Sequence, residues 1–410
     1  MMSDYDIVIA GGGLAGSTLA CALANSGARI AIIESVEASA DHQPSFDDRA
    51  IALAYGSQRI FEGIGLWDSI APGATAIKKI HVSERGGFGF THLDAAEEQV
   101  PALGYVALAR ELGSAIMRQL EDSSVTRISP ATVTGFSQMD NLLSVGVEAD
   151  GRQQQFTTRL LVAADGGQSL IRRQLDIKTR QWEYGQTAIV TNVTPGIPHH
   201  NIAYERFTPN GPLALLPMTE NRFGVVLTIN SEACDEVMAL DDNAFIALLQ
   251  QRIGFRCGRF SRIGRRFSYP LTLMTANEAV RPRIALVGNA GHALHPISGQ
   301  GFNLGLRDIA VLADLIANAR SQQQDPGSEQ LLQQYQKQRL PDQQQVALLT
   351  DGLVRLFGNP LRGISMGRNL GMLATDLLPG VRHHIARHAM GLGGIQSRLA
   401  RGLPTLGTEQ

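Results

Sequence analysis

The sequence has few of the features that mark secreted, membrane-spanning or metal-binding proteins. It contains only three cysteines, Cys21, Cys234 and Cys257, and their spacing fits no disulfide framework. No run of about eighteen apolar residues is present, so we expect no membrane-spanning segment. No cluster of residues has the spacing of metal ligands, and the formal net charge of -2 gives no reason to expect a nucleic-acid partner.

The composition is that of a globular protein. Hydrophobic residues make up 44% and charged residues 18% of the 410 positions, which is enough chain for two or three domains with a large core. Because the first glycine motif begins a few residues after Met1, we expect no signal peptide, and the few cysteines fit a reducing cytoplasm.

The most informative pattern lies in the first thirty-four residues. A short β-branched run, Ile7 to Ala10, is followed by Gly11, Gly13 and Gly16 in G-x-G-x-x-G spacing, then by a helical stretch and a second strand that ends at Glu34. The three glycines suit a tight turn, close approach of a pyrophosphate, and close packing of helix on sheet. A carboxylate in the place of Glu34 can bind ribose hydroxyls, so this segment predicts a dinucleotide-binding unit.

Two later strands end in similar turns. The apolar run 160–164 leads into Asp165-Gly166, and the run 284–287 leads into Gly288-Asn289. Because the carboxyl ends of parallel strands line one crevice, we expect all three turns to bind a single extended nucleotide.

Two arginines lie where they could contact the same nucleotide. Arg49 follows a polar loop, and Arg110 lies on the polar face of a helix expected over 107–120. Either guanidinium could pair with phosphate or bind ribose, although Arg49 could also be a solvated loop residue.

These turns, together with His295-Pro-Ile-Ser-Gly-Gln-Gly-Phe-Asn-Leu-Gly305, resemble the FAD-dependent aromatic hydroxylases of the group A flavoprotein monooxygenases. The resemblance covers about residues 4–320. The segments Asp47–Leu53 and Phe207–Pro217 and the pair Gly288-Asn289 are most similar to the ubiquinone-biosynthesis branch of that family. The wider family usually has Asp where Asn289 stands, and Asn offers a neutral acceptor instead.

The resemblance implies an α/β fold of the para-hydroxybenzoate-hydroxylase kind. A Rossmann-like FAD-binding domain would comprise residues 1–75, 100–182 and 274–320. A β-sheet domain for the substrate, residues 76–99 and 183–273, would be interleaved with it, and residues 321–410 would form a C-terminal helical region.

It also implies a set of site residues. The expected noncovalent FAD site consists of Gly11, Gly13, Gly16, Glu34, Arg49, Arg110, Asp165, Gly166, Gly288, Asn289, Gly299, Gly301 and Asn303. His295 and Pro296 would lie beside the flavin ring, although His295 could equally fix only the backbone. Leu213, Leu215 and Pro217 would line an apolar substrate pocket. No residue is expected to act in catalysis independently of the flavin.

In the implied reaction NAD(P)H reduces the flavin, O2 adds to give a C4a-hydroperoxide, and the distal oxygen hydroxylates a polyprenylated phenol of the 2-polyprenyl-6-methoxyphenol type. Only one complete G-x-G-x-x-G motif is present, so NAD(P)H is expected to bind transiently. Three alternatives stay open: an oxidoreductase without oxygen insertion, a hydroxylase acting at another ring position in the same pathway, and a flavin-stabilised subunit of a biosynthetic assembly.

The C-terminal region has its own composition. Residues 321–345 are rich in glutamine and contain Pro341, which suggests a linker with one helix over 329–339. From Arg355 to Arg401 there are seven arginines and one acid, Asp376, with apolar residues at helical spacing. Such a tail can lie on anionic lipid at the inner membrane, bind a partner protein of a ubiquinone-biosynthesis assembly, or pack on its own domain.

Overall fold

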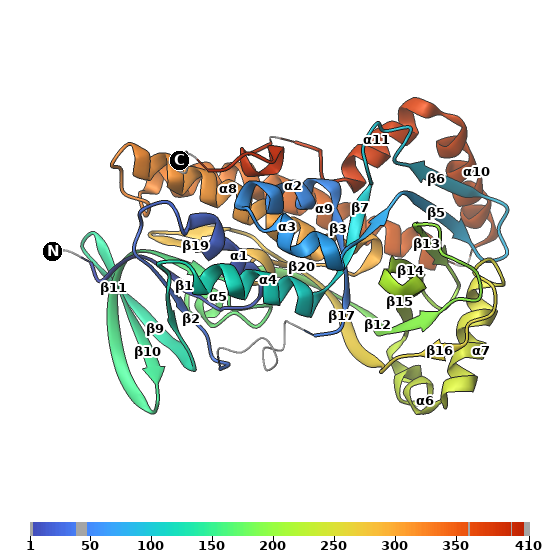
Figure 1. Cartoon of the computed structure of the whole chain (residues 1–410), viewed down its shortest axis with the longest axis horizontal. Coiled ribbons are helices and arrows are strands. Elements are labelled where there is room, and N and C mark those ends of the chain that lie inside the picture. Colours follow the sequence, from blue (N-terminus) through green and yellow to red (C-terminus); the bar gives the residue numbers. More distant parts are fainter. Residues whose placement is uncertain (1–2, 38–46, 360, 395, 406–410) are drawn as a thin grey trace.

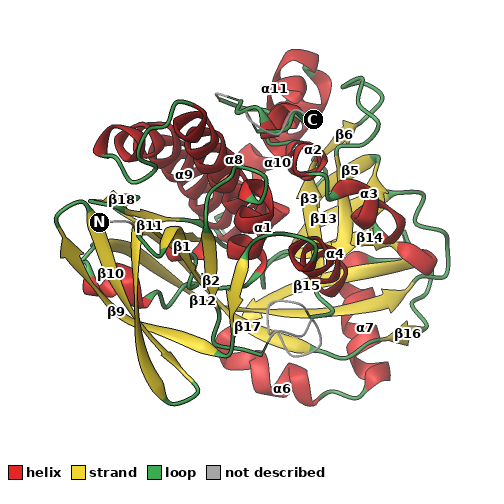
Figure 2. Cartoon of the chain, turned by 60° about the vertical axis from the view of Figure 1, so that its left-hand side comes forward, coloured by secondary structure: helices red, strands yellow, loops and turns green. Residues whose placement is uncertain are grey.

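A computed structural model describes residues 3–37, 47–359, 361–394 and 396–405, and two large sheets dominate this part of the chain (Figures 1 and 2). In Figure 1 one sheet lies toward the N-terminus label and the other toward α7 and α10. The order of strands and helices confirms the predicted α/β class.

The first sheet has eight strands in its described part. Its main path runs β18-β19-β11-β1-β2-β8, and β10 and β9 extend β11 as a hairpin. The pairs that join β19, β11, β1, β2 and β8 are parallel. The strands are β1 (Tyr5–Ala10), β2 (Ile30–Ile33), β8 (Thr126–Ile128), β9 (Ala131–Met139), β10 (Leu142–Ala149), β11 (Arg152–Ala163), β18 (Val280–Arg281) and β19 (Ile284–Leu286).

Both faces of this sheet are buried, as its unbroken apolar strands require. On β1, Ile7 and Ile9 belong to the core beneath the helices α1 (Leu14–Leu23), α4 (Ala109–Glu121) and α8 (Gln300–Ser321). Val8 and Ala10 point the other way, into the core shared with the β9–β10 hairpin and α5 (Leu170–Gln174). Successive residues therefore serve opposite layers.

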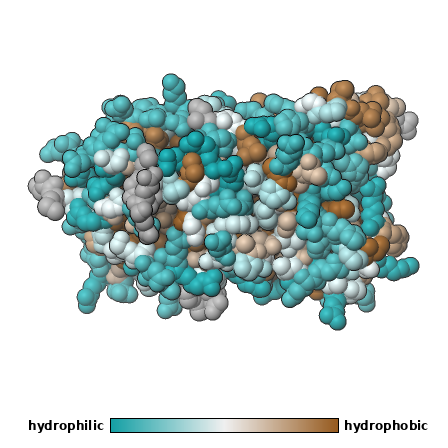
Figure 3. All heavy atoms as spheres, turned by 45° about the horizontal axis from the view of Figure 1, so that its top comes forward, coloured by the Kyte–Doolittle hydropathy of each residue, from teal (hydrophilic) through white to brown (hydrophobic). Residues whose placement is uncertain are grey.

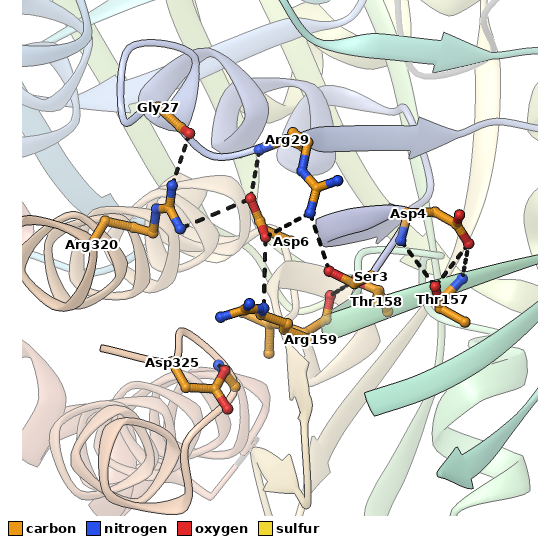
Figure 4. A network of polar contacts seen from close by, with 12 residues as sticks. Ser3, Asp4, Asp6, Gly27, Arg29, Thr157, Thr158, Arg159, Arg320 and Asp325 are labelled. Atoms are coloured by element: carbon orange, nitrogen blue, oxygen red, sulfur yellow. Dashed lines mark hydrogen bonds and ion pairs between the residues drawn. The ribbon is translucent and has the colours of Figure 1, made fainter. Parts of the chain in front are cut away.

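The end of this sheet where β1 begins is fastened by a polar network around Asp6 (Figure 4). The buried Asp6 carboxylate accepts from the backbone N–H of Arg29 at 3.0 Å and pairs with its guanidinium at 3.3 Å. Arg159 and Arg320 approach the same carboxylate at 3.7 and 3.9 Å. These charges join β1, β11 and the end of α8, and leave the opposite end of the strands for the glycine turns.

The second sheet has nine described strands, and its main path runs β20-β17-β12-β15-β14-β13-β5-β6, with β16 beside β12. One face packs on α6 (Cys234–Ala239) and α7 (Asp242–Ile253). The strands are β5 (Lys79–Glu84), β6 (Phe90–Asp94), β12 (Thr179–Thr194), β13 (Ile202–Phe207), β14 (Leu213–Met218), β15 (Arg222–Asn230), β16 (Arg262–Ile263), β17 (Phe267–Ala276) and β20 (His292–Ala293).

A small antiparallel sheet joins the two large ones. Its order is β3 (Ala50–Ala54), β7 (Gly104–Leu108) and β4 (Thr75–Ile77), and the helices α2 (Tyr55–Ile64) and α3 (Trp67–Ile70) follow β3. Figure 1 shows β3 and β7 between the two ends of the molecule.

The C-terminal region is largely helical, as expected, but the helix predicted over 329–339 extends nineteen residues beyond its predicted end. It consists of α9 (Glu329–Gly358), α10 (Arg362–Leu377) and α11 (Pro379–Ala389). Pro341 lies inside α9. The part of α9 that precedes this proline is stabilised by the burial of Leu331, Leu332 and Tyr335 in the core of the first sheet. Its many glutamines also have a favourable helix propensity.

The predicted division into domains stays a prediction, but the sheets show where its boundaries fall. The segment 76–99 contributes β5 and β6 to the second sheet, while β12 already begins at Thr179 and β20 lies within 274–320. Among the described residues, no helix is both long enough and apolar enough to cross a membrane.

Candidate active site

A cavity of about 1180 Å³ lies between the glycine turns of the first sheet, the second sheet and the C-terminal helices. This exceeds the roughly 300–1,000 Å³ of common ligand pockets. Nine of the predicted site residues line it: Gly13, Arg49, Gly166, Gly288, Asn289, Pro296, Gly299, Gly301 and Asn303. The other predicted residues are not part of its lining: Gly11, Gly16, Glu34, Arg110, Asp165, His295, Leu213, Leu215 and Pro217. We call the side with the glycine turns the cradle wall.

The first turn of the cradle wall admits only glycine at two positions. Gly11 has φ +104°, and a Cβ there would lie 2.4 Å from the carbonyl oxygen of Ala164. A Cβ on Gly16 would lie 1.9 Å from the carbonyl oxygen of Gly11. Gly13 precedes α1 without any side-chain cap, so the first N–H groups of the helix are left for an anion.

Two carboxylates flank this turn. The Oε2 of Glu34 accepts from the backbone N–H of Gly12 at 2.5 Å, which holds it at the end of β2. Asp165 follows β11, and its Oδ2 accepts from the N–H of Ile171 at 3.3 Å. Its Oδ1 is buried and has no hydrogen-bond partner in the described structure. A hydroxyl of a bound nucleotide would satisfy this oxygen, so the site fits an FAD molecule.

The two predicted arginines lie on adjacent segments, since the N–H of Ala109 donates to the Arg49 carbonyl at 3.0 Å. The Nε of Arg49 donates to Asp47 at 2.7 Å, and its guanidinium lies 5.2 Å from the ring centre of Tyr269. Arg110, in the first turn of α4, pairs with Asp48. Only Arg49 lines the cavity, so Arg110 would reach a ligand only by leaving its partner.

The third turn is pressed against α8. Gly288 has φ +60°, and a Cβ on Gly305 of α8 would lie 3.3 Å from the Gly288 Cα. The exposed Asn289 faces the cavity. Asp308, one turn further along α8, accepts from the N–H of Gly288 at 3.3 Å and pairs with His292 Nε2 at 2.7 Å. The turn is therefore held by the helix behind it.

Asp308 also fastens α9. Its side chain is fully buried, and Oδ1 accepts from Arg339 Nε at 2.8 Å and from Gln343 Nε2 at 3.0 Å. Burial by itself would raise the pKa of Asp308, but the Arg339 charge and the His292 ring hold this pKa below its usual value. Neither Arg339 nor Gln343 was among the predicted site residues: Arg339 is the last residue of the helix expected over 329–339, and Gln343 lies beyond its expected end. The available signal was an arginine one helical turn after Tyr335, within a stretch made largely of glutamine and leucine.

Asn303 supports the loop that precedes it. Its Oδ1 accepts from Ala54 N–H at 2.8 Å and Ser57 Oγ at 2.7 Å, and its Nδ2 donates to the carbonyls of Ala52 and Gly299 at 2.8 and 2.6 Å. These four bonds satisfy the amide. A bond from this side chain to FAD would require breaking one of them.

His295 and Pro296 differ in position. Pro296 lines the cavity, whereas His295 is fully buried, accepts from the N–H of Ile297 at 3.2 Å and packs edge-on against Tyr184. Burial lowers the pKa of His295 to about 4, so the ring is neutral near pH 7. This position suits the backbone-fixing alternative better than a role at the ring.

The opposite side of the cavity, which we call the sheet wall, is the free face of the second sheet. The predicted pocket residues need a correction here. Leu213 and Leu215 point away from the cavity into the core with α7, and Pro217 has the same phase. Ala214 and Leu216 line the cavity instead. The strand was correctly located, but both of its faces are apolar, so the pattern did not indicate which face meets the cavity.

One carboxylate on the sheet wall was missed altogether. Glu205 of β13 is half-buried and lines the cavity together with Ala203 and Phe207, which share its face of the strand. Burial among apolar neighbours raises its pKa to about 7. The signal was present in the sequence, as an acid in the apolar phase of an alternating strand.

The C-terminal helices close the third side. Leu353, Phe357, Met372 and Ile385 of α9, α10 and α11 line the cavity. The outer faces of these helices expose other apolar side chains, and Figure 3 shows hydrophobic residues gathered at the end where Figure 1 places α10 and α11. We call this the leucine surface: Leu348, Leu349, Leu361, Met366, Leu370, Leu377, Leu378 and Val381.

Known proteins have similar sequences. The model of the FAD binding domain family matches residues 4–350. The chain is 40% identical to the ubiquinone hydroxylase UbiL of Rhodospirillum rubrum, with 97% of this chain and 93% of the relative covered. It is 30% identical to the 3-demethoxyubiquinol 3-hydroxylase of Escherichia coli, with coverages of 94% and 98%.

A solved structure has the same fold. The p-nitrophenol 4-monooxygenase PnpA of Pseudomonas putida superposes with a TM-score of 0.79 at 18% identity, covering 97% of this chain and all of that one. At this identity the likeness concerns the fold alone.

Proposed function

This chain belongs to the FAD binding domain family and is a FAD-dependent aromatic monooxygenase, and we propose that it hydroxylates the ring of a polyprenylated phenol in ubiquinone biosynthesis. The observation that supports the proposal most directly is that two chemically different surfaces, the cradle wall and the sheet wall, face one cavity. The cradle wall suits a dinucleotide, and the sheet wall suits an apolar substrate. The names of the relatives from Rhodospirillum rubrum and Escherichia coli support the pathway.

FAD would be held mainly by backbone groups. The N–H groups at the start of α1 would meet the pyrophosphate, Glu34 and Asp165 would meet hydroxyls, and the start of α8 near Gly301 would face the flavin ring. The bound flavin would supply hydride acceptance from transiently bound NAD(P)H and the transfer of one oxygen atom from O2. The nine predicted site residues that line the cavity support this arrangement.

The substrate would occupy the space between the cradle wall and the sheet wall. Val82, Val190, Leu216 and Val226 contribute apolar surface there, and each buried methylene of a prenyl chain would add about 0.8 kcal/mol to binding. Such a lining also keeps water away from the reacting oxygen. The chain's own contribution is therefore to hold the phenol ring and to keep the site dry.

The test is to incubate the FAD-loaded protein with NAD(P)H, a 2-polyprenyl-6-methoxyphenol and ¹⁸O-labelled O2. We expect one labelled oxygen in the product, and NMR of the product identifies the ring position. A 3-demethoxyubiquinol in place of the phenol tests the alternative ring position, which the Escherichia coli relative supports. Turnover without O2, or product oxygen from water, would instead indicate an oxidoreductase without oxygen insertion.

We also propose that the leucine surface contacts membrane lipid. Its side chains are exposed on helices whose inner faces line the cavity, so a prenylated molecule could pass between lipid and cavity over a short path. The arginines of the same region suit anionic headgroups. Leu377 and Leu378 at the turn between α10 and α11 are 68% and 53% exposed.

Cosedimentation with vesicles tests this contact. The double variant Leu377→Ser with Leu378→Ser should lose binding to vesicles of phosphatidylcholine and phosphatidylglycerol, and neutral vesicles should bind the wild type more weakly. Phe255→Ser is the matched control, since Phe255 is 62% exposed but lies after α7. Equal binding of the double variant and the wild type would exclude lipid contact through these leucines; binding to neither vesicle would favour a protein partner.

A further inference from the structure

Hydroxylation of a phenol is helped by a group that accepts the hydroxyl proton. The titratable or charged side chains that line the cavity, within the described residues, are Arg49, Tyr204, Glu205, Tyr269 and Arg368. Glu205 is the carboxylate of this set. It is therefore the side chain suited to act as a base near neutral pH.

The register of the second sheet fixes where Glu205 points. On β13 it lies opposite Ala214 of β14 and opposite Val82 of β5. The same row continues to Thr91 on one side and to Val226 and Val190 on the other. All six residues of this row line the cavity. Residues that are directly opposite one another on neighbouring strands lie on the same face of a sheet, so the carboxylate of Glu205 projects into the cavity with these five neighbours. Four of the five are apolar, and the fifth, Thr91, has a hydroxyl.

Glu205 has no side-chain partner in the described structure, and its raised pKa comes from burial alone. The charged groups that line the same cavity are engaged elsewhere. Arg49 pairs with Asp47, to which the hydroxyl of Tyr269 also donates at 3.2 Å. From α10, Arg368 pairs with Glu84 and donates to two backbone carbonyls of the α9 end.

The side chains that face Glu205 from the neighbouring strands carry no charge, and Arg206, the next residue of β13, does not line the cavity. Tyr204 precedes it in β13, and its ring packs against His81 and Phe223. The facing residues of β5 and β14, Val82 and Ala214, are apolar, as are Leu353 and Phe357 of α9 on the third side of the cavity. A carboxylate left unpaired in such a place is costly unless a ligand provides a donor.

We propose that Glu205 accepts first a hydrogen bond and then the proton from the phenol hydroxyl of the substrate. The phenol O–H bond breaks, a new O–H bond forms on a carboxylate oxygen of Glu205, and the electron pair stays on the phenol oxygen. That charge is shared with the ortho and para ring carbons, which become more nucleophilic toward the oxygen atom to be inserted. The inference rests on the proposed phenol hydroxylation, and it adds the residue that activates the ring.

The kinetic test compares the FAD-loaded wild type with Glu205→Gln and with Glu205→Asp. Glutamine keeps the size but cannot take a proton, so we expect hydroxylation to fall about 100-fold or more, within the usual range for general bases. The rise of the wild-type rate with pH through about 7 should vanish in Glu205→Gln and persist, at a lower rate, in Glu205→Asp. Flavin content and flavin reduction by NAD(P)H should be unchanged. Glu220→Gln, at an exposed glutamate that pairs with Arg222 outside the cavity, is the control.

A binding measurement tests the same contact without turnover. A 2-prenyl-6-methoxyphenol should raise the melting temperature of the wild type more than its O-methyl ether does, because the ether has no O–H to donate. Glu205→Gln should not make this distinction.

The outcomes separate the two proposals. If the wild type distinguishes the phenol from the ether but inserts no labelled oxygen, the proposed hydroxylation fails while the contact stands. If the wild type hydroxylates and Glu205→Gln keeps its rate and pH profile, or if the wild type binds phenol and ether equally, the role of Glu205 is overturned.

Discussion

The cradle wall and the sheet wall face each other across one cavity, but the first presents mainly backbone and the second mainly side chains. On the cradle wall, glycines at the strand ends leave peptide N–H groups uncovered, and a Cβ at Gly11 or Gly16 would collide with a carbonyl oxygen. On the sheet wall, alternate residues of each strand supply apolar surface. Cofactor binding therefore depends on the backbone conformation, whereas substrate binding depends on the side chains that the strands present to the cavity.

This difference makes the two walls sensitive to different substitutions. On the cradle wall even one added methyl group should disturb binding, because backbone atoms cannot move aside easily. On the sheet wall the effect of a substitution should depend on its phase along the strand. Three predictions test this contrast.

The largest effect is expected for Gly16→Ala. The new Cβ would lie 1.9 Å from the Gly11 carbonyl oxygen, so the turn has to open and FAD affinity should fall by at least about 100-fold. Gly167→Ala is the control, since a Cβ there meets nothing within 4 Å. Flavin absorbance after gel filtration and titration of the apoprotein with FAD measure the loss. A Gly16→Ala protein with full flavin content would contradict the role of the cradle wall.

The next effect concerns the support behind the cradle wall. Asp308→Asn leaves the buried Arg339 with Asp342 as its remaining ion-pair partner, and this should cost about 3 kcal/mol in the free energy of unfolding at pH 7. The pKa of Asp308 is lowered in the fold, so its stabilisation is present above the usual aspartate pKa and is lost as the pH falls below it. The gap between variant and wild type in urea unfolding should therefore shrink toward pH 3.

Asp342→Asn is the matched control for that experiment. Asp342 also pairs with Arg339, at 2.8 Å, and with Arg307, at 3.0 Å, but its side chain is 26% exposed, so its loss should cost less. Equal losses for the two variants would show that the contact of Asp308 with the Gly288 turn adds nothing.

The smallest change in stability is expected for Leu216→Asn on the sheet wall. Its neighbour Leu215, which faces the core, provides the comparison. Leu215→Asn places an unpaired amide in the core with Phe245 and should cost about 2–5 kcal/mol in the free energy of unfolding. Leu216→Asn faces the cavity and should cost less than about 1 kcal/mol, but it should increase the NAD(P)H oxidised per product formed. Denaturant unfolding and the ratio of NAD(P)H to product measure the two effects. Reversed outcomes would mean that the phase of β14 is the one first expected.

The sequence was sufficient to predict the fold class, the family and the cofactor because these follow from local patterns. The turn after β1 needs Gly11 and Gly16 for steric reasons, and such requirements leave a fixed spacing. The two later turns were recognisable because each one follows a short buried strand. Nine of the predicted site residues share one cavity as a result.

The rest could not be predicted because it depends on contacts between distant segments. Whether Leu215 or Leu216 meets the cavity is decided by α7, which packs on one face of β14. The sequence marks Glu205 as an acid in an apolar phase, but only the pairing of β13 with β5 and β14 places it in the cavity. Similarly, Pro341 suggested the end of a helix, but the burial of Tyr335 and the ion pair of Arg339 keep α9 continuous.

The tie between Asp308, the Gly288 turn and α9 has a consequence for protein synthesis. The cradle begins at Gly11, but its third turn forms only after residue 288, and the helix that fastens that turn extends past Gln343. A growing chain on the ribosome therefore carries an incomplete cradle until about five-sixths of it has been translated. We therefore expect FAD to bind late in synthesis, and α10 and α11 are the last helices to be added to a cradle that α9 has already fastened.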